Sequence, residues 1–242
     1  MNIVSSSYIK IGGIDIRIER KTIKNLHVGV YPPYGRVRIA APYYMDDEAV
    51  RLAVISRLAW IKRQIRSFQE QRRESKREMV SGESHYFLGR RYLLEVSYGS
   101  FKHGVILKHS TMELRVKPGT TLENRYKVLQ EWYRSELQSI VRRFVDKWEK
   151  TIGIRLNGWQ IKRMKTKWGS CNIEKKKILL NLHLARVPVE CIEYIVVHEM
   201  VHLLQRHHND AFRIYMDRFL PEWESCRATL NQFILGHEEW EQ

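Results

Sequence analysis

The chain has 242 residues, of which 43% are apolar, enough for a hydrophobic core in one large domain or two small ones. Its 42 Lys and Arg residues exceed its 27 Asp and Glu residues by 15, a surplus that favours an anionic partner such as a nucleotide, a nucleic acid or an acidic peptide. The same surplus also suits a basic surface that serves only solubility, so charge alone selects no function.

Targeting and redox signals point to the cell interior. The three cysteines, Cys171, Cys191 and Cys226, lie far apart, which argues against a disulfide framework and against a CxxC metal site. The first twenty residues lack the apolar centre of a signal peptide, and no apolar run approaches the length that crosses a bilayer. We therefore expect a cytoplasmic protein without membrane contact.

The first 45 residues alternate between apolar and polar side chains, as strands with one buried face do. Two strands within 7–20 are expected to join at Gly12-Gly13, because glycines accept the positive φ of tight turns. A second hairpin is expected over 26–42, turning around residues 32–35. Asp46 or Asp47 then offers an N-cap for one amphipathic helix. Its apolar positions recur every three or four residues: Val50, Val54, Leu58, Ile61, Ile65 and Phe68.

The middle of the chain changes from strands to a long helix. Strands are expected over 89–99, 104–109 and 111–119, and Pro118-Gly119 marks the change. Apolar residues at helical spacing follow from Leu122 to Gly153, where a glycine offers a stop. We place a soft domain boundary near residue 120, between a strand-rich part (1–120) and a C-terminal part (121–242).

The C-terminal part begins with strand-like stretches over 159–171 and 175–185. Pro188 suits the first turn of a helix that runs to about residue 205. A short helix over 209–221, capped by Asn209 or Asp210, and a last helix over 222–236 complete the predicted elements. This order of elements predicts an α+β fold.

The helix ending near 205 carries a candidate metal site. His198 and His202 lie four residues apart, so both imidazoles project from one helix face, and Glu199 follows His198 directly. This is the HExxH pattern, in which two histidines bind Zn²⁺ and the glutamate acts as general base. The apolar residues 195–197 indicate a buried helix, where an unsatisfied charge is costly. We therefore expect one Zn²⁺ per chain, held by His198 and His202, with Glu199 as the catalytic group.

A third ligand must come from further along the chain. His208 points away from the other two histidines if the helix continues, so we expect the chain to turn soon after Leu204 and bring His208 back. No glycine is present in 205–207 to ease that turn. His207 and Glu222 are the alternatives, and Glu222 also suits a helix cap after Pro221.

Five further stretches stand out: SGESHYFLGRRYLLEV (81–96), MKTKWGSC (164–171), KILLNLHLA (177–185), VVHEMVHLLQRHHNDAF (196–212) and FLPEW (219–223). Together they resemble one protein family, the YgjP-like metal-dependent hydrolases, which are relatives of the SprT-like and WLM zincins. The resemblance implies a minimal zincin core at the C-terminus, zinc ligands at His198, His202 and His208, a catalytic Glu199, and peptidase chemistry. The resemblance extends over most of the chain.

Substrate contacts are harder to predict. The stretch 181–185 is a candidate edge strand for an extended peptide, which would place Asn181 at the substrate. Lys165 and Lys167 belong to a basic collar that also includes Lys162, Arg163 and 175–177. Tyr215 is a candidate oxyanion donor, although packing explains it better.

Three functions remain open on these observations. The first is a zinc metallopeptidase, in which the ion and Glu199 activate water. The basic collar suits a phosphoanhydride, so a nucleoside triphosphate pyrophosphohydrolase is the alternative. A zinc scaffold that binds nucleic acid without turnover is the third, and the intact Glu199 argues against it, because a structural site needs no base.

Overall fold

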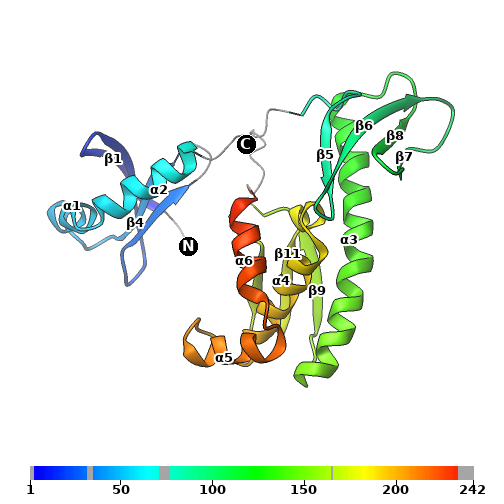
Figure 1. Cartoon of the computed structure of the whole chain (residues 1–242). Coiled ribbons are helices and arrows are strands. Elements are labelled where there is room, and N and C mark those ends of the chain that lie inside the picture. Colours follow the sequence, from blue (N-terminus) through cyan, green and yellow to red (C-terminus); the bar gives the residue numbers. More distant parts are fainter. Residues whose placement is uncertain (1–2, 32–34, 71–76, 165, 234–242) are drawn as a thin grey trace. The chain divides into compact units, whose positions relative to one another are not determined.

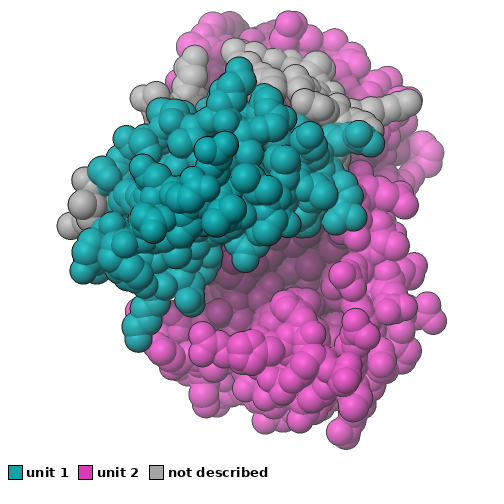
Figure 2. All heavy atoms as spheres, turned by 90° about the vertical axis from the view of Figure 1, so that its left-hand side faces the viewer, with its two compact units in different colours: residues 1–74 teal, residues 75–242 magenta. Residues whose placement is uncertain are grey.

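The structure is a computed structural model that describes residues 3–31, 35–70, 77–164 and 166–233. The chain forms two compact units, residues 1–74 and residues 75–242, which Figure 2 shows in different colours. The division lies well before the boundary expected near residue 120, which falls inside the second unit. Each unit has its own hydrophobic core.

Unit 1 consists of a four-stranded sheet and two helices that share one core (Figure 1). The strand order is β1-β2-β4-β3, with β2 and β4 parallel and the outer pairs antiparallel. The positive φ angles of Gly12 and Gly13 form the expected turn between β1 and β2. Residues 32–34 of the second expected turn lie outside the described residues. The bounds are β1 (Ile3–Ile11), β2 (Ile14–Lys21), β3 (His27–Tyr31), β4 (Arg36–Pro42), α1 (Asp47–Ile55) and α2 (Leu58–Glu70).

The single helix expected from Asp47 to Phe68 is two helices. Asp46 caps α1 as expected, since its carboxylate accepts a hydrogen bond from the Ala49 amide at 2.6 Å. The helix ends at Ile55, where the Ser56 hydroxyl donates to the Ala53 carbonyl at 3.0 Å. Serine side chains that bond to the local backbone compete with the helical pattern, and apolar periodicity alone does not reveal such a break.

Unit 2 contains two further sheets and the long helix α3 (Figure 1). The strand order of the first is β5-β6-β8-β7, and the strand order of the second is β10-β11-β9. Thr121 caps α3, and Gly153 ends it with a φ of 77°. The bounds of the first part are β5 (Ser84–Phe87), β6 (Arg90–Tyr98), β7 (Gly104–Leu107), β8 (Thr111–Val116) and α3 (Leu122–Ile152). The second part comprises β9 (Gly158–Lys162), β10 (Gly169–Asn172), β11 (Lys177–Asn181), the 3₁₀ helix η1 (Leu182–Arg186), α4 (Val189–Val201), α5 (Asp210–Phe219) and α6 (Trp223–Gln232).

One core joins both sheets of unit 2 to α3 and α4, which explains why the first of these sheets belongs with the C-terminal part. Tyr133 of α3 is buried against Phe87 of β5, and its hydroxyl donates to the Tyr86 carbonyl at 2.8 Å. The change of element type at residue 119 is therefore not a change of domain. The predicted α+β class is confirmed. In the described parts of the chain no helix, α3 included, combines the length and the hydrophobicity of a membrane span.

Candidate metal centre

Three histidines of unit 2 converge at one point. Candidate ligand atoms of His198, His202 and His208 all lie within 4.8 Å of one another. The Nε2 atoms of His198 and His208 are 3.0 Å apart, and the three ring centroids are separated by 4.7–5.0 Å. Two nitrogens that bind one tetrahedral Zn²⁺ are about 3.3 Å apart, given Zn–N distances near 2.05 Å. The geometry therefore fits a divalent metal ion.

The cluster forms because α4 ends earlier than its apolar pattern indicates. α4 stops at Val201, and His202 occupies the C-cap with helical φ and ψ, so it keeps its orientation relative to His198. The Leu204 and Gln205 amides both donate to the Val201 carbonyl at 2.9 Å, which tightens the last turn. The chain then turns back, as expected, and Asn209 starts α5 by accepting from the Phe212 amide.

An apolar ring supports the three imidazoles. The Phe212 ring lies 5.0 Å from the ring of His198, 4.9 Å from that of His202 and 4.7 Å from that of His208. Phe212 is buried, and the Asn209 cap fixes the turn of helix that carries it. It therefore restricts all three rings at once.

The protonation states also suit a metal ligand set. Burial, followed by the charges of its two histidine neighbours, lowers the pKa of His198 to about 3, and burial lowers the pKa of His202. His202 Nδ1 lies 3.3 Å from the Gln205 carbonyl, to which it donates, and this leaves the Nε2 lone pair available. Neutral imidazoles with free lone pairs are the form that binds metal ions.

Glu199 lies beside the cluster and is almost fully buried, with 5% of its surface exposed. Burial raises the pKa of its carboxyl to about 8, and the positive charge of Lys167 partly opposes this rise. A Cβ atom at Gly169 would lie 2.6 Å from Glu199 Oε1 and 2.8 Å from its Cγ. Glycine at 169 is therefore what allows β10 to approach the carboxylate so closely.

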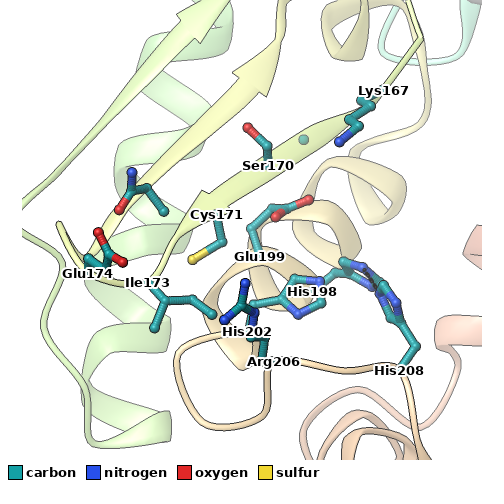
Figure 3. A pocket seen from close by; sticks show the side chains of 12 residues that line it. Lys167, Ser170, Cys171, Ile173, Glu174, His198, Glu199, His202, Arg206 and His208 are labelled. Carbon is teal, nitrogen blue, oxygen red and sulfur yellow. Dashed lines mark hydrogen bonds between the residues drawn. The ribbon is translucent and has the colours of Figure 1, made fainter. Parts of the chain in front are cut away.

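The cluster and Glu199 border a pocket of about 560 Å³ with two unlike sides (Figure 3). We call one side the helix wall; it consists of His198, Glu199, His202, Arg206 and His208. We call the other side the strand wall; it consists of Lys167 and residues 169–174. In Figure 3 the Glu199 side chain lies between the histidines and the strand wall.

The strand wall is the edge of a sheet, and it differs from the predicted edge strand. The expected edge, 181–185, is the end of β11 followed by η1, and β11 lies between β10 and β9 with both edges paired. β10 pairs with β11 alone among the described strands. The available edge beside Glu199 is therefore β10.

Asn181 supports the strand wall from behind. Its side chain is fully buried. Its amide nitrogen donates to the carbonyls of Met164 and Lys167 at 2.9 and 2.7 Å, and its oxygen accepts from the amides of Met164 and His183. These bonds fix the segment that leads into β10, and they leave Asn181 no free group for the substrate contact that the sequence suggested.

Of the other predicted substrate contacts and alternative metal ligands, only one lines the pocket among the described residues. Lys167 lines the pocket, whereas Lys165 lies outside the described residues. Tyr215 stacks on Phe219 with ring centroids 6.1 Å apart and lines neither pocket that includes Glu199. Neither His207 nor Glu222 belongs to the histidine group, the one such cluster found within the described residues.

Cys171 and His183 also carry atoms that could bind a metal ion, but neither has the sequence spacing of a ligand relative to the histidines. Cys171 lines the pocket, and burial together with Glu199 raises the pKa of its thiol to about 11. His183 is buried, and its Nε2 atom has no hydrogen-bond partner among the residues that the structure describes.

The sequence did not predict three residues of the site. Phe212 follows His208 by four positions, a helical spacing that indicates contact once the start of α5 is known. Gly169 resembles a simple turn residue in the sequence, and only the tertiary structure shows how near Glu199 lies. Arg206 lines the pocket, but no local pattern distinguishes it from the other basic residues.

A protein-family model described as "YgjP-like, metallopeptidase domain" matches residues 24–233. Two solved structures are similar over part of the chain, and both are metallopeptidase zymogens. Abylysin of Pyrococcus abyssi is 18% identical, with a TM-score of 0.35, and the match covers 37% of this chain and 90% of abylysin. Jannalysin of Methanocaldococcus jannaschii is 23% identical, with a TM-score of 0.33, and the match covers 40% of this chain and 94% of jannalysin.

None of the curated proteins matches the chain significantly. The family model covers most of the chain, including β5 to β8, α3 and the histidine cluster. It also confirms the resemblance drawn from the sequence. The chain belongs to the YgjP-like metallopeptidase domain family.

Proposed function

We propose that the protein is a zinc-dependent metallopeptidase that hydrolyses extended peptide segments. The observation that carries this proposal is the placement of Glu199 between three converging imidazoles and an available strand edge. His198, His202 and His208 would hold the ion through their Nε2 atoms. A zinc ion bound there acts as a Lewis acid that lowers the pKa of water and polarises a carbonyl.

The chain's own residues supply the proton transfer. The Glu199 carboxylate takes a proton from the attacking water and passes it to the leaving amine nitrogen. Burial raises the pKa of this carboxyl, which favours its role as a proton acceptor, and a bound cation would oppose that rise. Gly169 holds β10 against the carboxylate, which limits the directions in which it can point.

The strand wall supplies substrate binding. An extended peptide that pairs with the edge of β10 receives backbone hydrogen bonds, as in other strand-addition complexes. Antiparallel pairing is slightly more stable than parallel pairing. In that orientation the peptide runs from the Asn172 end of β10 towards Gly169 and passes over Glu199.

A triphosphate pyrophosphohydrolase is the second candidate, because Lys167 and Arg206 line the same pocket as Glu199. Lys and Arg side chains bind phosphate groups through charge-assisted hydrogen bonds. The rest of the basic collar favours this function less, since Lys162, Arg163 and Lys175 do not line the pocket.

The test uses the full chain reconstituted with zinc and assayed on an unfolded protein substrate and on the four nucleoside triphosphates. We expect peptide cleavage that a chelator abolishes and that Glu199→Gln reduces about 10²- to 10⁴-fold, the usual contribution of a general base. Glu190→Gln is the matched control, because Glu190 is exposed on the first turn of the same helix.

Two results would contradict the peptidase proposal. Triphosphate hydrolysis without peptide cleavage, abolished by Glu199→Gln, would establish the second candidate. Zinc binding without turnover of either substrate class would leave a zinc-binding scaffold.

A further inference from the structure

A second, smaller cavity also borders Glu199. It has a volume of about 240 Å³ and shares Gly169, His198 and Glu199 with the larger pocket. Helix α6 contributes Arg227, Leu230 and Asn231 to its lining. We call this cavity the α6 pocket. Because it touches both Glu199 and His198, a group bound there lies next to the reacting bond of any substrate.

Arg227 gives the α6 pocket its charge. The centre of its guanidinium lies 6.0 Å from the centroid of the Trp223 ring, which supports it by a cation–π contact. No carboxylate in the described part of the chain forms an ion pair with Arg227. Arg227 and His198 line the same cavity, so the guanidinium is near the histidine cluster.

The other residues that line the α6 pocket also favour an anionic ligand. Glu199 is the only acidic residue among the residues that line the α6 pocket, and its carboxylate is already assigned to proton transfer. Asn231 adds a side-chain amide that can donate beside the guanidinium, while Leu230 is buried beneath. A planar guanidinium with a neighbouring donor matches the two oxygens of a carboxylate.

The direction of the strand wall decides which part of a substrate reaches this pocket. The α6 pocket adjoins Gly169 at the start of β10, whereas the larger pocket extends to Asn172 and Glu174 beyond its end. A peptide antiparallel to β10 therefore places the residues that follow the scissile bond at the α6 pocket. This step rests on the proposed peptidase function.

We propose that the α6 pocket binds a substrate carboxylate on the C-terminal side of the scissile bond, with Arg227 as its principal ligand. The carboxylate has two possible sources, an Asp or Glu side chain just after the scissile bond or the terminal carboxylate of a short leaving peptide. In both cases the pocket makes Arg227 a specificity-determining residue. The protein would then prefer acidic sites, or release short C-terminal fragments.

The experiment compares peptides that share one sequence and differ at one feature. One pair carries Glu or Gln immediately after the scissile bond, and a second pair ends in a free acid or an amide a few residues after it. The ratio of kcat/KM within each pair identifies the source. We expect the acid to be favoured about tenfold to a hundredfold in one pair, the range for a hydrogen bond to a charged group.

Variants of Arg227 test its role. Arg227→Leu should abolish the preference within that pair, Arg227→Glu should reverse it towards a Lys-containing peptide, and Arg227→Lys should restore it in part. Arg218→Leu is the matched control, since Arg218 also lies over an aromatic ring, that of Phe219, but lines neither pocket. The zinc content of the Arg227 variants should equal that of the unmodified protein.

A binding measurement separates this inference from the proposed function. Calorimetry on the Glu199→Gln protein should show the same preference for acidic peptides, and the same loss in Glu199→Gln/Arg227→Leu. Arg227-dependent binding without cleavage by the unmodified protein would refute the peptidase proposal alone. Equal affinity for both members of each pair, or no peptide binding, would overturn the α6 pocket proposal.

Discussion

The helix wall and the strand wall face the same pocket but are built in opposite ways. The helix wall comes from one short stretch, 198–208, and local geometry with Phe212 beneath it fixes the imidazoles. The strand wall depends on partners distant in sequence: β11 beside it and Asn181 behind it. Metal binding should therefore depend on the helix wall alone, whereas turnover should depend on both walls, because Gly169 positions Glu199.

The strongest test of the helix wall is His202→Ala. Zinc sites in small proteins release about 10–16 kcal/mol in total, so losing one of three protein ligands should weaken zinc binding about a thousandfold. Titration against a chelator of known affinity measures this change. His207→Ala is the control, because His207 is a neighbouring exposed histidine outside the group. Equal losses in the two variants would contradict the ligand assignment.

Gly169→Ala tests the strand wall. The new Cβ would overlap the Glu199 carboxylate, at 2.6 Å from Oε1, and would displace it. Misplacement of a reacting group by about 1 Å costs about a hundredfold in rate, so kcat should fall by that amount while zinc content stays constant. Gly104→Ala in β7 is the control, since a Cβ added there would meet no atom within 4 Å. Loss of zinc from Gly169→Ala would show that the two walls are not separable.

Asn181→Ala removes the support behind the strand wall and leaves the helix wall intact. Several partly buried backbone groups lose their partner, and each unsatisfied group is costly, so the free energy of unfolding should fall by about 2 kcal/mol. Denaturant unfolding followed by circular dichroism measures the change. Asn157→Ala removes a single exposed hydrogen bond to the Lys175 carbonyl and should cost much less. Similar effects of the two substitutions would refute the supporting role of Asn181.

A pH titration of the free energy of unfolding distinguishes His183 from the metal cluster. Burial, with the charges of Arg186 and Arg163, lowers the pKa of His183 to about 3 from its ordinary value of 6.5. The unfolded chain therefore binds one more proton between these values, and the free energy of unfolding should fall as pH drops through that window. The slope from this one group approaches about 1.4 kcal/mol per pH unit.

His183→Gln should reduce that slope, because glutamine does not titrate. The metal-free forms of both proteins are compared, so that the cluster histidines contribute equally. An unchanged slope between pH 6 and pH 4 would mean that His183 is not buried in the neutral form.

The sequence predicts most of the helix wall and little of the strand wall. The spacing of His198, Glu199 and His202 is a local property of a helix, and the need for a turn before His208 follows from the same geometry. The prediction of an edge strand at 181–185 is wrong because strand periodicity does not tell which strand of a sheet lies at its edge. Sheet order depends on long-range pairing, here of β11 with both β9 and β10.

Other differences between the predicted and the observed elements also involve contacts that sequence periodicity does not reveal. At the break between α1 and α2 the Ser56 hydroxyl bonds to the local backbone, and Tyr133 of α3 packs against a sheet that precedes it by many residues. Arg227 and Asn231 carry no motif of their own, and only the fold brings α6 beside Glu199.

The proposed function depends above all on three imidazoles that hold one ion beside Glu199. Anomalous diffraction at the zinc edge, from crystals of the zinc-reconstituted protein, observes that ion without reference to activity. We expect one strong peak about 2.0–2.1 Å from the Nε2 atoms of His198, His202 and His208. A peak coordinated by Cys171, His183 or Glu222 in place of any of these histidines, or no peak at the cluster, would contradict the proposal.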